Sequence, residues 1–215
     1  FTNSVYPLTD ESTTLYAHWG DKTVTYMFTA DGGSAVKQVT YTVGTVLYEM
    51  PSSVRDNYCF VSWCFDQTML SPLTLPYTVP DNTDDFVMLY ANFVPGTTDV
   101  LRFDTISSTG DREYEVTYSG TAEKIVVPDS YYGKKVTRIR RIESTTVRTV
   151  VLPQTVNEFV NGAFEGCTSL ETINIPFAVK SIPQKCFADC GALTEISIPQ
   201  GVTSIGKEAF AGCSS

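Results

Sequence analysis

The sequence predicts a mainly β protein in which small β modules precede a solenoid with a narrow parallel sheet. Charged residues make up only 18% of the chain, below the roughly 25% of an average soluble domain. Thr, Ser, Val and Tyr, which are typical of half-buried strands, are plentiful. The C-terminal part repeats at a fixed interval, which predicts the solenoid. The N-terminal part alternates apolar and polar residues between turn signals, which predicts strands and hairpins.

The solenoid prediction depends on three consecutive copies that start at Val147, Leu170 and Leu193, so that both spacings are 23 residues (170 − 147 and 193 − 170). A looser copy precedes them, and its proline lies 25 residues before Pro153 (153 − 128). Recurring aliphatic positions at such a period indicate that each turn buries its apolar face against its neighbours. We therefore assign residues 122–215 to a solenoid of about four turns.

The copies that start at Leu170 and Leu193 contain the pattern L-x-x-I-x-I-P, and the copy that starts at Val147 has V-x-x-V-x-L-P. This pattern of aliphatic residues predicts one short strand per turn. Because side chains alternate between the two faces of a strand, Leu170, Ile173 and Ile175 are expected to face the core. Pro176 ends the strand because proline cannot donate to the ladder. The outward positions of the three copies form a candidate partner-binding strip, which we call the outward strip: Arg148, Thr149, Glu171, Thr172, Asn174, Thr194, Glu195 and Ser197.

The combination of I-x-I-P with V-x-x-I-x-x-x-A-F-x-x-C resembles the BspA-type (Treponema pallidum type) leucine-rich repeat of bacterial surface proteins, over residues 122–215. Cys186 stands where the family usually has Ala, and the A-F-x-x-C segment is missing at residues 141–146, so we expect an irregular first turn. Before the solenoid, residues 96–121 contain two alternating stretches around a Ser-Ser-Thr-Gly-Asp turn. We expect them to form a hairpin that caps the open end of the solenoid.

The N-terminal part also repeats, since TTLYAHW, ending at Trp19, recurs as VMLYANF, ending at Phe93, 74 residues later (93 − 19). Residues 1–20 are then the tail of a truncated copy, and residues 21–95 are a complete copy. Inside this copy, two alternating stretches are joined by Asp-Gly-Gly at positions 31–33, a strong hairpin signal.

The complete copy resembles the Listeria-Bacteroides repeat, also called the internalin B-type repeat, from V-x-F-x-x-x-G-G to T-L-Y-A-x-W. The resemblance implies a small β-grasp-like fold. Asn57 and Ser62 stand where the family has Gly, so we expect an altered central turn.

The formal net charge of −9 argues against nucleic acid and anionic lipid as partners, because their phosphates would repel the chain. Residues 1–95 carry 10 acids and 3 bases, whereas residues 96–215 carry 14 acids and 12 bases. No apolar run reaches the roughly 20 residues of a membrane span, so no direct membrane insertion is expected.

A catalytic site is not predicted, because neither a nucleophile with its base nor a tuned carboxylate pair can be assembled. The single histidine, His18, lies in a predicted strand, and the equivalent position of the second copy is Asn92. We therefore expect a protein that is not an enzyme and binds no cofactor.

The cysteines suggest two alternatives. Cys167, Cys190 and Cys213 occupy one position of successive turns, so adjacent thiols are close enough for a bridge, but parallel side chains would have to twist strongly to form one. We expect free, inward-facing thiols that pack as small hydrophobes. Cys59 and Cys64 would lie on opposite faces of a straight strand and have no partners at zinc spacing, so no metal site is predicted.

Two charged segments also leave alternatives open. Residues 81–85 gather oxygen ligands that could hold calcium, but they lack the spacing and glycine of a calcium loop, so a solvated turn is expected. One basic cluster either meets an acidic glycan or the acidic N-terminal module, or is the solvent side of a strand interrupted by Val136 and Ile139. It consists of Lys134, Lys135, Arg138, Arg140 and Arg141.

The resemblance to both families implies an extracellular, cell-surface protein of a host-associated bacterium. We expect a non-catalytic adhesin or host-interaction protein that binds a host or bacterial surface protein or glycan. The alternative is a passive stalk or an accessory module of a larger secreted protein that degrades glycans. The chain is expected to be a fragment, because it starts inside one repeat and ends without a polar cap.

Overall fold

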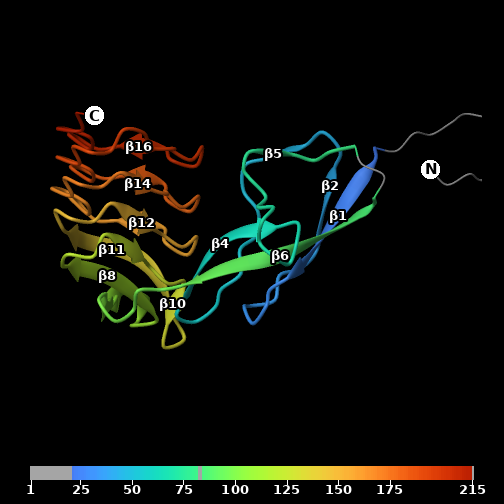
Figure 1. The fold of residues 1–215 in the computed structure, drawn as a ribbon, viewed down its shortest axis with the longest axis horizontal. Helices are drawn as coiled ribbons and strands as arrows, with labels where there is room; N and C mark the ends of the chain where they lie inside the picture. The colour runs from blue at the N-terminus through green and yellow to red at the C-terminus, as the bar shows by residue number, and fades with distance from the viewer. Residues whose placement is uncertain (1–20, 82–83, 215) are drawn as a thin grey trace, which may run out of the picture.

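The computed structural model describes residues 21–81 and 84–214, which form β-strands and one short 3-10 helix, η1 (Ser107–Thr109). Figure 1 shows the stacked turns of the solenoid on one side and an open sheet on the other. Each part has its own hydrophobic cluster, one running from Val24 to Ala91 and the other from Leu101 to Ala209. The mainly β fold class and the solenoid predicted from the sequence are confirmed.

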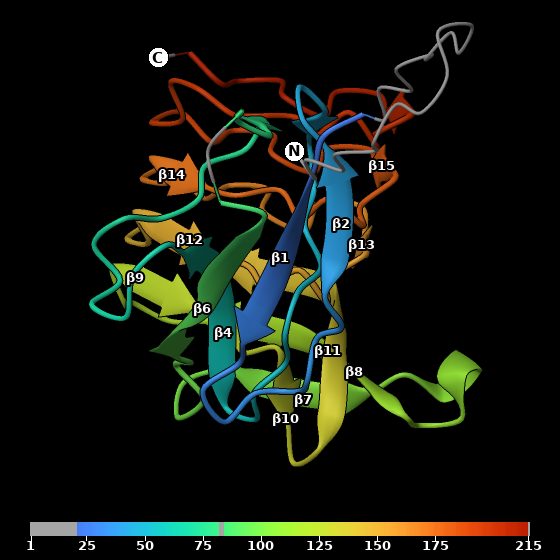
Figure 2. The same ribbon diagram turned by 90° about the vertical axis from the view of Figure 1, so that its right-hand side faces the viewer.

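The N-terminal part is a four-stranded mixed sheet with a small two-stranded ribbon beside it. Strand β1 runs parallel to β6 at the centre of the sheet, while the outer pairs are antiparallel. The first and last strands of this part therefore lie side by side (Figure 2). The sheet has the order β2-β1-β6-β4, with β1 (Thr23–Thr29), β2 (Val39–Thr42), β4 (Tyr58–Cys64) and β6 (Phe86–Pro95), and the ribbon pairs β3 (Val46–Leu47) with β5 (Tyr77–Thr78).

The hairpin expected at positions 31–33 is confirmed, because β1 pairs antiparallel with β2 from Thr23 opposite Thr42 to Tyr26 opposite Val39. Gly33 is required by close packing: a Cβ there would lie 2.5 Å from the Ser53 Oγ and 2.6 Å from the ring of Phe93.

The central turn is altered in a specific way. Asn57 takes the left-handed conformation (φ 63°) that glycine adopts most easily, and asparagine is one of the few other residues that tolerate it. Strand β4 then has a register shift between Phe60 and Ser62. Because this bulge adds one residue to the strand, Cys59 and Cys64 share a face, and both are fully buried. The expectation that they lie on opposite faces, which assumed a straight strand, was wrong.

The copies that start at Val147 and Leu170 carry two short strands each, not the single strand predicted, and the copy that starts at Leu193 carries one. The L-x-x-I-x-I segments form one parallel sheet. Beyond the proline corner, Ser181–Ile182 pairs in parallel with Ser204–Ile205, whereas Glu158–Phe159 pairs with Arg138–Ile139 of the preceding turn. In the last copy, residues 193–198 form no strand. The first set is β9 (Lys124–Val126), β12 (Thr149–Val151) and β14 (Thr172–Ile173), and the second is β13 (Glu158–Phe159), β15 (Ser181–Ile182) and β16 (Ser204–Ile205).

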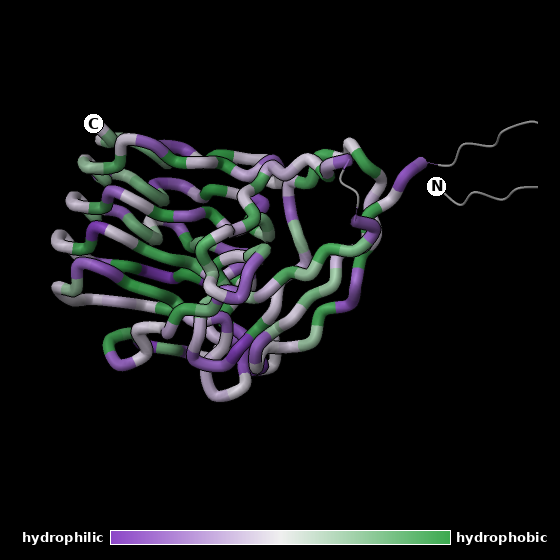
Figure 3. Tube along the Cα trace, turned by 45° about the vertical axis from the view of Figure 1, so that its right-hand side comes forward, coloured by the Kyte–Doolittle hydropathy of each residue, from purple (hydrophilic) through white to green (hydrophobic). Residues whose placement is uncertain are grey.

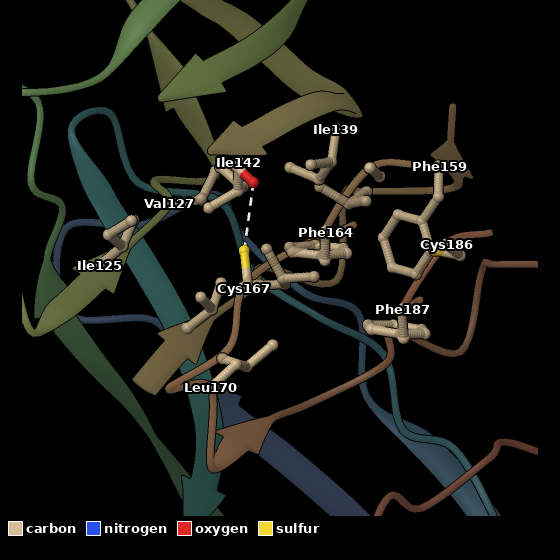
Figure 4. Close-up of a cluster of buried hydrophobic side chains, with 14 of the residues drawn as sticks. Ile125, Val127, Ile139, Ile142, Phe159, Phe164, Cys167, Leu170, Cys186 and Phe187 are labelled. Atoms are coloured by element: carbon tan, nitrogen blue, oxygen red, sulfur yellow. Dashed lines mark hydrogen bonds between the residues drawn. The ribbon is translucent and has the colours of Figure 1, made fainter. Parts of the chain in front are cut away.

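Aromatic and cysteine columns fill the solenoid core (Figure 4). The ring of Phe187 stacks on Phe164 with centroids 5.1 Å apart and on Phe210 at 5.4 Å. Each thiol of the cysteine column donates to a carbonyl of the preceding turn, as Cys190 Sγ does to Phe164 O at 3.2 Å. The equivalent bond from Cys167 to Ile142 O is drawn in Figure 4. Stacked inward columns were predicted, but these sulfur hydrogen bonds were not.

A five-stranded sheet covers the first turn of the solenoid. The predicted hairpin is present: β7 (Arg102–Thr105) pairs antiparallel with β8 (Glu113–Ser119). Strand β8 then pairs in parallel with the long strand β11 (Lys134–Glu143). The partners of β11 on the other side are β10 (Ser130–Tyr131), which is antiparallel, and β13, which is parallel. The first turn is irregular as expected, because β11 continues through the segment where A-F-x-x-C is missing.

Hydrogen bonds join the N-terminal sheet to the first turn of the solenoid. The backbone N–H of Asp129 donates to Tyr58 O at 2.6 Å, and the Asp129 carboxylate accepts from the N–H of Phe60 at 3.0 Å. Beside them, Ser130 Oγ donates to the carboxylate of Asp56 at 2.9 Å. Asp129 is only 1% exposed, and burial raises its pKa to about 7. This junction holds β4 against the solenoid.

Candidate binding surface

The outward strip begins with two rungs that link adjacent turns. The guanidinium of Arg148 lies 2.5 Å from the carboxylate of Glu171, and the hydroxyls of Thr149 and Thr172 are 3.2 Å apart. Both rungs join residues 23 positions apart, as the repeat predicts. Hydrophobic and hydrophilic residues alternate along the stacked turns (Figure 3), so the strip is the polar face of the same segments that fill the core.

Asn174 differs from its neighbours in the strip because its side chain holds the preceding turn. Its Oδ1 accepts from the N–H of Leu152 at 2.8 Å, and its Nδ2 donates to the carbonyl of Leu152 at 2.7 Å. Asn174 was predicted only as an outward position of a partner-binding strip, and these two bonds show that its side chain also holds the backbone of the turn before it. An Asn between two Ile residues of a strand was the available signal, since Asn is unfavourable there unless it has a specific partner.

The last rung of the strip is solvent-exposed at Thr194, Glu195 and Ser197. The segment that carries them lacks the predicted strand, although Leu193 is buried and Ile196 packs against the core. The first two inward positions are therefore kept without ladder pairing, whereas Ile198, the third, is 41% exposed.

A groove of about 410 Å³ lies beside the strip. Strands β12 and β14 line one side, and Phe60 and Val61 of β4 line the other. This wall could not be predicted from the sequence, because the repeat pattern of the solenoid carries no information about a strand that starts 91 residues earlier (149 − 58). Thr149, Thr172 and Asn174 thus face a groove, whereas Arg148 and Glu171 lie outside its lining.

The three arginines of the basic cluster form ion pairs within the solenoid and its cap. Arg138 lies 3.5 Å from Glu115 and 2.7 Å from Glu158, and Arg140 lies 3.2 Å from Glu115. Glu115 and Glu158 belong to β8 and β13, not to the acidic N-terminal part. Burial of Val136 and Ile139 confirms that they interrupt the exposed side of this strand.

The described residues were also compared with the requirements of a metal site and of a membrane span. Among the residues that the structure describes, no group of three or more His, Cys, Asp and Glu side chains could hold a metal ion. In the 81–85 loop, Asp81 pairs with Lys22 at 2.8 Å, and residues 82–83 lie outside the described ranges, as does His18. Within residues 21–81 and 84–214, no helix is long and apolar enough to cross a membrane.

All six cysteines are free, and five of them are buried. Burial raises the pKa of the Cys190 thiol to about 12 and raises the pKa of Cys59 and Cys186 further. A thiolate is the reactive form of cysteine, so these side chains are unsuited to nucleophilic chemistry.

Residues 140–215 match the model of the BspA type leucine-rich repeat region, in six copies. The match covers the C-terminal turns, about a third of the chain. No curated protein matches this sequence. The likeness of residues 21–95 to the internalin B-type repeat stays a prediction.

Three solved leucine-rich repeat structures resemble the chain. A leucine-rich repeat protein of T. pallidum is 22% identical, with a TM-score of 0.44 over 54% of this chain and 66% of that one. One from Bacteroides ovatus ATCC 8483 is 29% identical, with a TM-score of 0.45 over 54% of this chain and 32% of that one. A leucine rich cell surface protein from Faecalibacterium prausnitzii A2-165 is 25% identical, with a TM-score of 0.42 over 55% of this chain and 31% of that one. The chain thus spans about two thirds of the first protein and about a third of the other two.

Proposed function

We propose that this chain belongs to a bacterial cell-surface protein that binds a host or bacterial surface protein or glycan through the outward strip and catalyses no reaction. The observation that carries the proposal is the ladder of outward side chains repeated every 23 residues on BspA-type repeats, with Arg148 and Glu171 as its charged rung. Solenoids present such regular surfaces to extended partners.

Binding through one copy of the strip is expected to be weak. The strip consists of short polar and mixed-charge side chains, whereas strong protein hot spots favour Trp, Tyr and Arg. Tight adhesion then requires many copies on one surface, since linked copies bind with a high effective concentration. In this proposal, residues 21–95 act as a spacer or secondary contact, residues 96–121 cap the solenoid, and residues 122–215 bind.

Adhesion of protein-coated beads to host cells and to bacterial cells tests the proposal. The variant combines Arg148→Ala, Glu171→Ala and Glu195→Ala, and should fold normally, because exposed substitutions typically change stability by less than about 0.5 kcal/mol each. The matched control combines Arg102→Ala, Asp104→Ala and Lys207→Ala, which also removes two charges of one sign and one of the other, from two exposed sites and one partly exposed site. The strip variant makes the protein less negative by one charge, whereas the control makes it more negative by one. Adhesion is therefore compared at two salt concentrations, because salt screens the effect of net charge more than that of a direct contact.

Loss of adhesion in the strip variant alone supports the proposal. Equal adhesion of the folded strip variant and the wild type favours the second candidate, a passive stalk or accessory module whose activity lies in another part of the protein.

A further inference from the structure

A second groove lies between the N-terminal sheet and the solenoid, beyond the outward strip. It encloses about 490 Å³, within the range of roughly 300 to 1,000 Å³ typical of small-ligand sites, which often lie where two modules meet. One wall comes from β2 and β3 with the residues that follow β3, and the other from two proline corners of the solenoid. The first wall presents the side chains of Tyr41, Tyr48 and Glu49, and the second presents those of Phe177, Lys180 and Gln200.

The solenoid wall is a product of the repeat. Gln154, Phe177 and Gln200 each follow the proline of a turn, so they form a column at intervals of 23 residues (177 − 154 and 200 − 177). The N–H of Phe177 donates to the side-chain oxygen of Gln154 at 3.1 Å. Since Gln154 lines the groove beside the strip and Phe177 lines this one, the two grooves meet at this column.

Aromatic rings line both walls of the groove. Tyr48 is 44% exposed, Tyr41 and Phe177 are partly exposed, and all three border the same space. Burial, together with the nearby Glu49 carboxylate, raises the pKa of Tyr41, so its phenol remains protonated and able to donate a hydrogen bond.

The polar groups in the groove include hydrogen-bond donors, hydrogen-bond acceptors and an amide that can both donate and accept. Lys180 supplies a cation, Glu49 an anion and Gln200 an amide, so the two ionic side chains balance. Gly201 has no side chain between Lys180 and Phe177: a Cβ at this position would lie 3.0 Å from Lys180 Nζ and 3.1 Å from the carbonyl of Phe177. The ammonium group of Lys180 therefore lies close to the backbone at Gly201.

We propose that this groove binds a neutral oligosaccharide. A pyranose ring has a face of C–H groups that packs on aromatic rings, and a rim of hydroxyls that donate and accept hydrogen bonds, as this lining requires. Because the charges of Glu49 and Lys180 balance, the lining offers an acidic sugar no net attraction. This proposal rests on the proposed function only in the premise that the chain binds a partner. The groove and the outward strip have no side chain in common.

Binding of tetrasaccharides to the full chain tests this site. The probes are cellotetraose, maltotetraose, chitotetraose and mannotetraose, with tetragalacturonic acid as the acidic comparison, measured by calorimetry and by saturation-transfer NMR. The proposal expects at least one neutral probe to bind, with its ring C–H protons receiving the strongest saturation. Tyr48→Ala and Lys180→Ala should each weaken binding by about tenfold, because each removes one stacking or polar contact.

Matched controls separate the groove from the rest of the surface. Tyr132→Ala removes a tyrosine that is 77% exposed elsewhere, and Lys207→Ala removes an exposed lysine, so both should bind like the wild type. Gln200→Trp should fill the groove and block binding while it leaves Tyr48 and Lys180 in place. This variant therefore tests the site even if Tyr48→Ala does not fold.

The proposal would be contradicted if no neutral tetrasaccharide bound, or if the acidic tetrasaccharide bound more tightly than the neutral ones. It would also be contradicted if the groove variants bound with unchanged affinity, or if an extended peptide bound in the groove and no sugar competed with it. The outward-strip variant distinguishes this proposal from the proposed function. It should lose bead adhesion yet keep sugar binding, whereas Tyr48→Ala should lose sugar binding whether or not the strip mediates adhesion.

Discussion

The carboxylate of Asp129, on the first solenoid turn, accepts a hydrogen bond from the backbone N–H of Phe60 at 3.0 Å, and this bond links two parts of the chain that are 69 residues apart. The carboxyl is 1% exposed, and burial raises its pKa to about 7. The junction therefore contains a group that changes charge near neutral pH.

Asp129→Asn should change the pH dependence of stability. A carboxyl whose pKa is raised on folding contributes stability that is fully present below its unfolded pKa, about 3.9, and that is lost as pH rises to about 7. The amide of the variant does not titrate, so only the wild type should lose this stability between pH 4 and pH 7. The free energy of unfolding of the variant minus that of the wild type should therefore rise over this range, by no more than about 1.4 kcal/mol per pH unit. The pKa of Cys59, which faces Asp129, is raised, so that thiol stays uncharged throughout.

Urea unfolding of both proteins between pH 4 and pH 8 checks this prediction. Asp66, whose pKa is lowered to about 2 mainly by the Thr68 hydroxyl, titrates below this window and is common to both proteins. A difference between variant and wild type that stays constant with pH would show that Asp129 does not titrate there.

Asn174→Ala should destabilise the solenoid by about 1 to 3 kcal/mol, because it leaves the N–H and carbonyl of Leu152 without their side-chain partner. Ser197 is the matched control, since it occupies the same position one turn later (197 − 174 = 23) and is exposed. Ser197→Ala should change the free energy of unfolding by less than about 0.5 kcal/mol. Equal effects of the two substitutions on chemical denaturation would mean that the Asn174 bonds contribute nothing.

Much of the solenoid was predictable, because its core is periodic. A spacing of 23 residues places Phe164, Phe187 and Phe210 in one column, and the structure stacks their rings. The second strand of each turn was missed because V-x-x-I is too short to show an alternating pattern by itself. The Asp129 junction and the groove walls were not predictable, since they join segments with no common period.

Cys190→Ala should cost about 1 to 3 kcal/mol, because it leaves a small cavity and removes the thiol that donates to Phe164 O. Cys213→Ala, which alters the same motif position at a partly exposed site, should cost less. Thermal unfolding of both variants measures the order. A larger loss for Cys213→Ala would contradict the assignment of the cysteine column to the core.

Thiol titration under denaturing, non-reducing conditions should recover all six cysteines, because the column donates to backbone carbonyls and its sulfurs are not bonded to one another. Reduced and denatured protein provides the reference for complete recovery. Recovery of two thiols or fewer would show that the column is bridged.

The central claim, binding through the outward strip, is tested most directly by bead adhesion measured over a series of coating densities. Because each copy should bind weakly, adhesion of the wild type is predicted to rise more steeply than in proportion to density. Beads with the Arg148→Ala, Glu171→Ala and Glu195→Ala variant should stay near background at every density. Adhesion of the folded variant that matches the wild type across the series would contradict the account.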